Sequence, residues 1–195
     1  MPGERRLVVG LGNPGASYRD TRHNAGFAVL ERLAERHGVA RWEERCHSLV
    51  ARWASPQGPV LLARPQTFVN GSGLAVQALL AEERLPLAAL LVVVDDLHLP
   101  LGRLRLRAGG GDGGHNGLRD IAARLGTGYA RLRLGIGAAP APGEAQVAHV
   151  LGRWRDDERP ALEAMLERAA DAVELWLRAG AAAAQAINAP PAAGR

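Results

Sequence analysis

Residues 7–18 read LVVGLGNPGASY, and this stretch decides how the rest of the chain is interpreted. A short apolar run leads into Gly10, Gly12 and Gly15, whose spacing satisfies the G-x-G-x-x-G pattern of dinucleotide-binding loops. That pattern binds a pyrophosphate only when a helix opens inside it and points its N-terminus at the phosphates. Here a polar run follows, and helical spacing of apolar residues begins only at Phe27. The glycines therefore indicate a tight turn after a strand, and they leave Asn13 at the carboxyl end of that strand, where α/β proteins place ligands.

Outward from this stretch, apolar periodicity and turn signals predict strands that alternate with helices. The turn SPQG, residues 55–58, joins two strands into a hairpin. The pattern indicates one α/β domain over residues 1–188, a twisted mixed sheet flanked by helices in a three-layer sandwich, with a disordered tail over 189–195. Strands are expected over 7–11, 46–55, 59–65, 90–94, 101–107 and 131–136, and helices over 27–37, 72–83, 118–125, 145–151 and 158–178.

Composition narrows the class of protein. The chain has 195 residues, 47% hydrophobic and 23% charged, which are globular values. A single cysteine, an N-terminal stretch without a signal peptide, and a longest apolar run (87–94) too short to cross a bilayer predict a cytoplasmic protein with no membrane partner. The net charge is +4 and every basic side chain apart from histidine is arginine. Arginine forks onto phosphate, so the composition permits a nucleic-acid partner without establishing one.

Polar side chains with chemical capacity gather where predicted strands end, and parallel strand ends converge on one rim of a sheet. His23 is the only base active at neutral pH in its segment, and the N-terminus of the following helix is expected to keep its ring neutral. Asp95 can orient that ring, and amides can stabilise an oxyanion. No nucleophile motif and no metal-binding motif occurs, which favours attack by an activated water with no metal. The residues expected on this rim are Asn13, His23, Asn70, Asp95 and Asn116.

Each of these residues also has a plain structural interpretation. His23 can be an ordinary residue at a helix start, and Asp95 can cap a turn. Asn70 before Gly71 is a common turn pair, and Asn116 can be the N-cap of a helix that begins at 118. The other residues with a plain interpretation are His98 and His115, expected at the surface or in turns, and Arg103, Arg105 and Arg107, expected on one solvated strand face.

Taken together, four segments resemble the bacterial peptidyl-tRNA hydrolases: VGLGNPGASYRDTRHNAG, RPQTFVNGSG, DDLHLPLGRLRLRAGGGDGGHNGLRD and RLRLGIG. They occur in the family's order, and the resemblance covers residues 7–187. It implies hydrolysis of the ester that joins a peptide to the 3′ end of tRNA. It further implies a cytoplasmic monomer with no cofactor, no metal and no stable protein partner.

The resemblance also implies roles for individual residues. His23 would activate water, and Asp95 would orient His23. Asn13 and Asn70 would position the water and the substrate carbonyl, and Asn116 would hold the peptide or the 3′ end. Tyr18 and Val69 would line the crevice, and Arg107 and Arg133 would clamp the tRNA 5′ phosphate.

The chain departs from the family pattern at Val69, where methionine is usual, at His98, where an acid is common, and at Asp112, where histidine is usual. These changes concern peptide contacts and pH dependence rather than a proposed catalytic group. Two other classes stay open. An RNA-binding scaffold on the same fold is separated from the hydrolase by one hydrolysis assay, and a dinucleotide-dependent enzyme by a test of cofactor binding.

Overall fold

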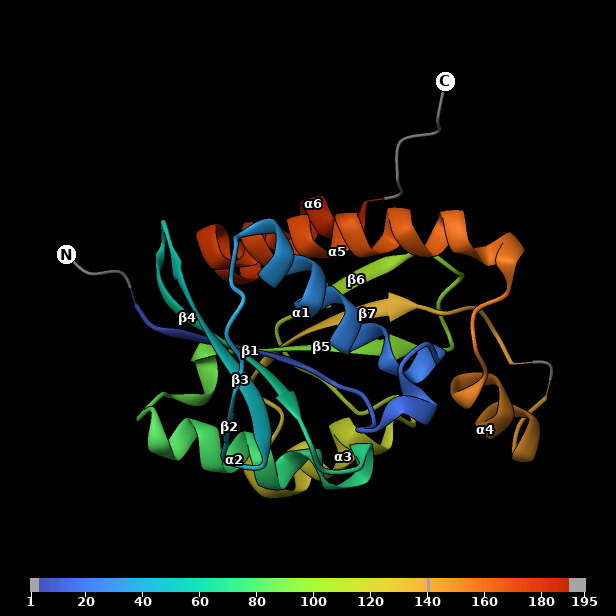
Figure 1. The fold of residues 1–195 in the computed structure, drawn as a ribbon, viewed down its shortest axis with the longest axis horizontal. Helices are drawn as coiled ribbons and strands as arrows, with labels where there is room; N and C mark the ends of the chain where they lie inside the picture. Colours follow the sequence, from blue (N-terminus) through green and yellow to red (C-terminus); the bar gives the residue numbers. More distant parts are fainter. Residues whose placement is uncertain (1–3, 140, 190–195) are drawn as a thin grey trace.

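The computed structural model describes residues 4–139 and 141–189 (Figure 1). Seven strands and six α-helices alternate along this part of the chain, with short 3-10 turns between them. The strands are β1 Arg6–Gly10, β2 Glu43–Arg45, β3 Ser48–Ser55, β4 Gly58–Pro65, β5 Leu90–Asp96, β6 Leu104–Arg107 and β7 Ala130–Gly135. The helices are α1 Ala25–Arg36, α2 Ser72–Glu82, α3 Asn116–Leu125, α4 Glu144–Leu151, α5 Arg159–Ala179 and α6 Ala184–Asn188.

The strands form one mixed sheet in the order β2-β3-β4-β1-β5-β7-β6. The central strands β4, β1, β5 and β7 are parallel, while β2, β3 and β6 run antiparallel to their neighbours. All seven residues of β5 are buried, as expected for a strand covered on both faces. The predicted mixed sheet is confirmed.

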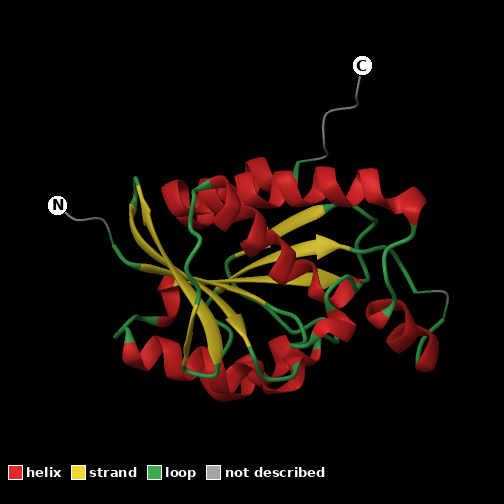
Figure 2. Ribbon diagram, viewed as in Figure 1, coloured by secondary structure: helices red, strands yellow, loops and turns green. Residues whose placement is uncertain are grey.

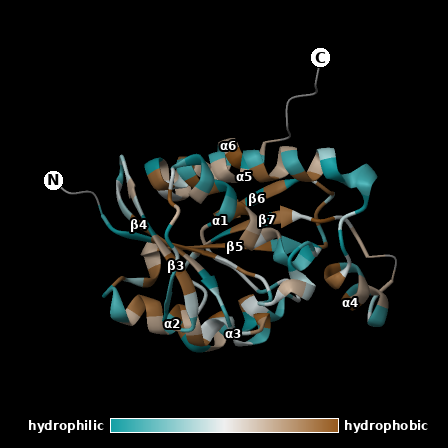
Figure 3. Ribbon diagram, viewed as in Figure 1, coloured by the Kyte–Doolittle hydropathy of each residue, from teal (hydrophilic) through white to brown (hydrophobic). Residues whose placement is uncertain are grey.

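Helices cover both faces of this sheet (Figure 2). Helices α1, α5 and α6 lie on one face over a core that includes Leu30, Leu132 and Trp176. Helices α2 and α3 lie on the other face over a second core that includes Leu79 and Ile121. The central strands are hydrophobic along their length, and hydrophilic residues collect on the outward sides of the helices (Figure 3). The predicted three-layer sandwich is therefore confirmed.

One rim of the sheet collects the carboxyl ends of β1, β5 and β7. In Figure 1 the arrowheads of β5 and β7 point toward the side where α4 lies. None of the residues of α4 is buried, so this helix stands beside the sheet rather than in a core. The rim and α4 together frame the region that the sequence predicts to be functional.

The opening glycines act mainly by close packing, which corrects the expectation of a tight turn. A Cβ on Gly10 would lie 2.3 Å from the carbonyl oxygen of Gly26, and a Cβ on Gly26 would lie 2.5 Å from that of Val93. Both contacts are too short for any side chain, so the two glycines let α1 approach β1 and β5. Of Gly10, Gly12 and Gly15, only Gly15 has a positive φ, 104°, the backbone conformation that favours glycine. The helix begins at Ala25, ten residues beyond Gly15 and two residues before the predicted start at residue 27.

Other local predictions need correction. The strand expected from residue 46 begins at Ser48, because Cys46 and His47 have positive φ angles of 48° and 57° and form a tight turn to β2. Such turns are usually signalled by Asn-Gly or Asp-Gly, so this sequence hides both the turn and the strand. The N-cap of α3 is His115 rather than Asn116. No helix in the described part of the chain is long and apolar enough to cross a membrane. Residues 190–195 of the predicted tail lie outside the described residues.

Candidate active site

His23 and Asp95 meet at the rim, as predicted. His23 lies on the 3-10 turn Arg22–Asn24 directly before α1, and Asp95 lies at the carboxyl end of β5. The Nδ1 atom of His23 is 3.0 Å from each carboxylate oxygen of Asp95. The Asp95 side chain is only 3% exposed, and a buried carboxylate accepts hydrogen bonds from its protein neighbours because water cannot reach it. This contact fixes the His23 tautomer with the proton on Nδ1 and leaves the Nε2 lone pair as a base.

His115 is a second histidine on the same carboxylate, and the expectation of a surface or turn residue is wrong. Its Nε2 lies 3.1 Å from Oδ1 of Asp95. Its Nδ1 accepts hydrogen bonds from the backbone N–H groups of Gly117 and Leu118, at 3.1 and 3.3 Å. Because Nδ1 is an acceptor, Nε2 must carry the proton and donate it to Asp95. His115 therefore caps α3 and holds Asp95 with one ring.

The electrostatics follow from this arrangement. Burial of His23 works against its charged form, but the charge of Asp95 and the hydrogen bond to it prevail, so the pKa of His23 is raised above its ordinary value of 6.5. Burial would raise the pKa of Asp95, but the two histidines and their hydrogen bonds hold it well below its usual range. The helix start was expected to keep His23 neutral. The opposite direction is found because the carboxylate is in direct contact with the ring.

Asn13 is held rigidly beside these groups. Its backbone N–H donates to Oδ1 of Asn24, and Nδ2 of Asn24 donates back to the carbonyl of Asn13, both at 2.9 Å. The side-chain Oδ1 of Asn13 accepts from the backbone N–H of Val69 at 2.9 Å. With Oδ1 engaged, the amide is oriented so that Nδ2 remains as its donor. Asn24 was not singled out by the sequence, although the segment HNAG contains it.

The other predicted residues are the amides Asn70 and Asn116 and the aromatic residue Tyr18. Asn70 is exposed on the 3-10 turn Val69–Gly71, while Val69 itself is buried. Tyr18 packs edge-to-face on Phe68, with ring centroids 6.2 Å apart. Phe68 is 59% exposed, a large apolar ring open to solvent beside Tyr18, and no sequence pattern singles it out. Asn116 is exposed at the first position of α3, and its Oδ1 accepts from Arg119.

A cavity of about 320 Å³ joins His23 and Asp95 to α4. We call it the His23 cavity. Its apolar side comes from Leu97, Val147 and Val150, and its polar side includes Asn116 and Arg133. Asn13, Asn70, Tyr18 and Val69 do not line it, so the predicted residues do not all meet in one cavity. A site with a base, amide donors and an apolar wall suits a substrate that has both a polar reacting group and apolar side chains.

The two predicted phosphate-binding arginines lie on neighbouring strands. In the register of β6 and β7, Arg107 lies opposite Arg131, and Arg105 opposite Arg133, so all four side chains share one face. Arg107 is exposed. Arg133 is engaged: one guanidinium nitrogen lies 3.2 Å from Oδ2 of Asp96 and the other donates to the carbonyl of Gly111 at 2.8 Å. The alternation predicted for a solvated strand face holds at 105 and 107.

The residues with metal-ligand atoms in the described part of the chain include one close group, His23, Asp95 and His115, whose ligand atoms lie within 4.8 Å of one another. These atoms face each other at hydrogen-bond distances of 3.0 to 3.1 Å. A metal between them would have to displace both ring protons and the contacts they make. The donor set therefore fits a hydrogen-bonded base better than a metal centre.

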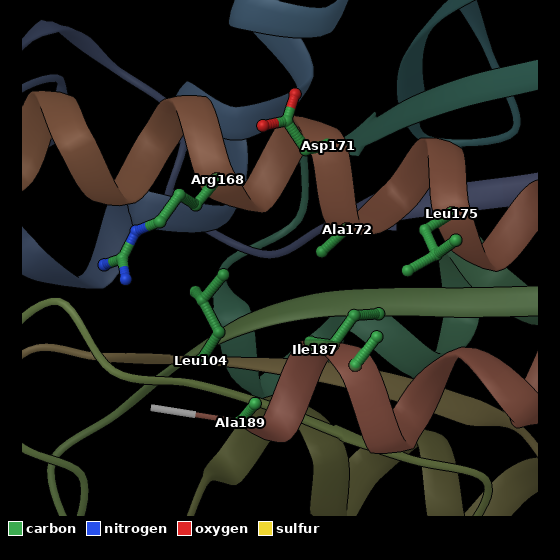
Figure 4. A pocket seen from close by; sticks show the side chains of 8 residues that line it. Leu104, Arg168, Asp171, Ala172, Leu175, Ile187 and Ala189 are labelled. Carbon is green, nitrogen blue, oxygen red and sulfur yellow. The ribbon is translucent and has the colours of Figure 1, made fainter. Parts of the chain in front are cut away.

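A separate cavity of about 240 Å³ opens between β6, α5 and α6 (Figure 4). Leu104, Leu175 and Ile187 point into it, with Arg168 and Asp171 nearby. None of the predicted site residues lines this cavity, so it is separate from the candidate active site.

Comparison with known proteins assigns the chain to a protein family. The family model described as "Peptidyl-tRNA hydrolase" matches residues 7–193. The chain belongs to the peptidyl-tRNA hydrolase family. The curated relatives agree: the peptidyl-tRNA hydrolase of Desulforudis audaxviator is 51% identical over 90% of this chain and 88% of its own length. That of Deinococcus deserti is 48% identical over 92% of this chain and 83% of its own length.

Solved structures of peptidyl-tRNA hydrolases share the fold. The enzyme from Acinetobacter baumannii has a TM-score of 0.90 and 36% identity, and 99% of each chain is covered. A peptidyl-tRNA hydrolase in complex with N-propanol has a TM-score of 0.90 and 37% identity over 96% of each chain. Membership of the peptidyl-tRNA hydrolase family confirms the resemblance and makes the protein a hydrolase.

Proposed function

We propose that this protein hydrolyses the ester between the peptide and the 3′-terminal ribose of peptidyl-tRNA, with His23 as the general base that activates water. One observation carries the proposal: Nδ1 of His23 is 3.0 Å from both oxygens of the buried Asp95, which leaves Nε2 as the basic atom beside a cavity of about 320 Å³. Family membership supplies the substrate class. The contact between His23 and Asp95 supports the role of His23 as the base.

The reaction balances without a covalent intermediate. Nε2 of His23 takes a proton from water as the water oxygen attacks the ester carbonyl, and a tetrahedral oxyanion forms. The carbon–oxygen bond to the ribose then breaks, and the proton on Nε2 passes to the 3′ oxygen. Asp95 stabilises the imidazolium that exists between these two transfers. His115 holds Asp95 in position from the other side through a hydrogen bond of 3.1 Å.

The amides are proposed to position the reacting groups. Nδ2 of Asn13 would donate to the carbonyl oxygen or hold the attacking water, since Oδ1 is engaged by Val69. Asn70 is exposed close to Asn13 in the structure, because its neighbour Val69 makes that contact, and it can serve the same carbonyl. Asn116 lines the His23 cavity and would bind the peptide or the 3′ end.

The arginines of β6 and β7 are proposed to bind the phosphate at the tRNA 5′ end. Arg107 is exposed on β6, and Arg133 lies diagonally across from it on β7, on the same face of the sheet. Because Arg133 is paired with Asp96 at 3.2 Å, it would bind phosphate with part of its fork while that pair holds it in place. A cytoplasmic location, a monomeric state and the lack of a cofactor also stay predictions.

The test is release of peptide from a defined N-acetylated peptidyl-tRNA by the purified protein, with and without EDTA. Turnover that EDTA leaves unchanged is expected. Binding of tRNA without hydrolysis would favour the RNA-binding scaffold instead, and loss of turnover in EDTA that zinc or magnesium restores would contradict the metal-independent base.

A further inference from the structure

A second polar cavity lies against Asn13, on the side of β4 and α1. It has a volume of about 240 Å³, and we call it the Arg64 cavity. Its lining includes the amides Asn13 and Asn24 and the charged residues Arg19, Glu31 and Arg64. None of its lining residues is shared with the His23 cavity.

The Arg64 cavity carries more positive than negative charge. The Arg64 side chain is 14% exposed and pairs with Glu31, which is 52% exposed. Its guanidinium is fixed by aromatic rings, 4.2 Å above the centroid of Trp42 and 5.9 Å from that of Phe27. Arg19 adds a second positive charge and makes no ion pair within residues 4–139 and 141–189. The described side chains therefore place two guanidinium groups and one carboxylate at this cavity.

The charge of Arg64 is incompletely compensated. Burial lowers the pKa of Arg64, and the nearby charge of Arg19 lowers it further, against the opposing effect of Glu31. The Nε atom of Arg64 is also buried with no hydrogen-bond partner among the described residues. An anion between the two arginines would relieve their repulsion and supply an acceptor for unused donors. An oxyanion suits this environment, because the side chains of both arginines line one small polar cavity.

The position of the cavity indicates that the oxyanion belongs to the substrate. Asn13 is joined to Asn24 by two hydrogen bonds of 2.9 Å, and Asn24 follows His23 in the chain. An ester attacked by water on His23 and held by Asn13 would therefore lie between the two cavities. One arm of the substrate would extend into the His23 cavity, and the other would pass the Arg64 cavity.

We propose that the Arg64 cavity, through Arg19 and Arg64, binds an oxyanion of the substrate, either the carboxylate of an acidic side chain in the peptide or a phosphodiester of the tRNA 3′ strand. This inference rests on the proposed function for the identity of the substrate. Arg19 and Arg64 act on affinity, because they lie outside the contact between His23 and Asp95.

The test compares Arg19→Gln, Arg64→Lys and the control Arg178→Gln, which removes an exposed arginine at the end of α5. Arg19 is exposed, so its variant keeps the test valid even if a change at buried Arg64 impairs folding. The substrates are one tRNA carrying N-acetylglutamyl or N-acetylglutaminyl, and a minimal ester of N-acetylglutamine on adenosine alone. Arg19→Gln should raise KM about tenfold, the equivalent of one charge-assisted hydrogen bond, with kcat within about twofold of the native value.

The substrates separate the two sources. If the oxyanion is a peptide carboxylate, the KM increase appears with N-acetylglutamyl and not with N-acetylglutaminyl. If it is a phosphodiester, both tRNA substrates show the increase and the adenosine ester does not. The proposal is overturned if both cavity variants match Arg178→Gln on every substrate, or if they raise KM equally on all three.

Direct binding distinguishes a failure of this inference from a failure of the proposed function. The trinucleotide CCA and N-acetylglutamate amide are titrated against the native protein and Arg19→Gln, with the arginine Nε–H signals followed by NMR. A shift of the Arg64 signal in the native protein, lost in Arg19→Gln, supports the oxyanion site even in a protein without turnover. Shifts absent for both probes would contradict it.

Discussion

The contact between His23 and Asp95 makes a quantitative prediction for Asp95→Asn. In the transition state His23 becomes an imidazolium 3.0 Å from the carboxylate. Two unit charges at that distance interact by about 5 kcal/mol at an effective dielectric constant near 20. An asparagine keeps about 1 kcal/mol of this as a neutral hydrogen bond. The remaining loss corresponds to a fall in kcat/KM of about 1,000-fold.

The pH dependence gives the same substitution a second readout. Neutral His23 is the reactive form, so kcat/KM of the native protein should fall as the pH drops through the raised pKa of His23, above 6.5. Because the charge of Asp95 helps to raise that pKa, Asp95→Asn should move this acidic limb to lower pH.

The assay is single-turnover hydrolysis of N-acetylated peptidyl-tRNA from pH 5 to 9. Asp171→Asn serves as the control, since it removes an exposed carboxylate on α5 with the same change of charge. Circular dichroism and tRNA binding should be unchanged in both variants. Activity of Asp95→Asn within tenfold of the native protein, or an acidic limb of kcat/KM that stays at the same pH, would refute the claim that the contact with Asp95 makes His23 an effective base.

Three further predictions follow from single contacts. His115→Ala removes a hydrogen bond to Asp95 and the cap of α3. It should lower kcat/KM about tenfold and the free energy of unfolding by about 1 kcal/mol. His115→Asn should restore the stability as a cap but not the rate, and equal recovery of both would contradict the positioning role. Glu158→Gln breaks the buried ion pair between Glu158 and Arg22, whose charged atoms are 2.6 Å apart. It should lower the free energy of unfolding in urea by about 3 kcal/mol, and a loss under about 1 kcal/mol would show that the pair is unimportant. Gly26→Ala should lower the free energy of unfolding by about 3 kcal/mol or prevent folding, because the added Cβ would lie 2.5 Å from the backbone oxygen of Val93. The control Gly111→Ala adds a Cβ in open space and should fold normally. Similar stability of the two variants would contradict the packing argument.

The architecture could be predicted because its signals are local. Buried strands such as β5 read as continuous apolar runs, and α5 shows a regular apolar stripe that ends at Gly180. The turn between β2 and β3 could not be predicted, because Cys46 and His47 adopt positive φ without any of the usual turn residues. The pairing of Arg45 with Ser48 leaves only these two residues to connect β2 and β3.

The candidate site was predictable in part for the same reason. Asp95 lies at the end of β5 and Asn13 follows β1, so the parallel topology brings these two residues to one rim. His23 reaches the same rim from the 3-10 turn before α1. His115 was missed because its role depends on the distance from α3 to β5, a long-range quantity. The GGHNG segment directly before a predicted helix was the available signal, and it pointed to a cap at Asn116 instead. The direction of the His23 pKa depends on a 3.0 Å contact that no sequence pattern reports.

The central claim is that His23 is the base, and His23→Asn tests it most directly. Asparagine keeps the polarity and approximate size of the ring near Asp95 but cannot accept a proton from water. The measurement is the rate of peptide release from saturating N-acetylated peptidyl-tRNA, alongside the Kd for the same tRNA. A rate reduced by about 1,000-fold or more with the Kd within about threefold is expected. Release at a rate near that of the native protein would contradict the assignment of His23.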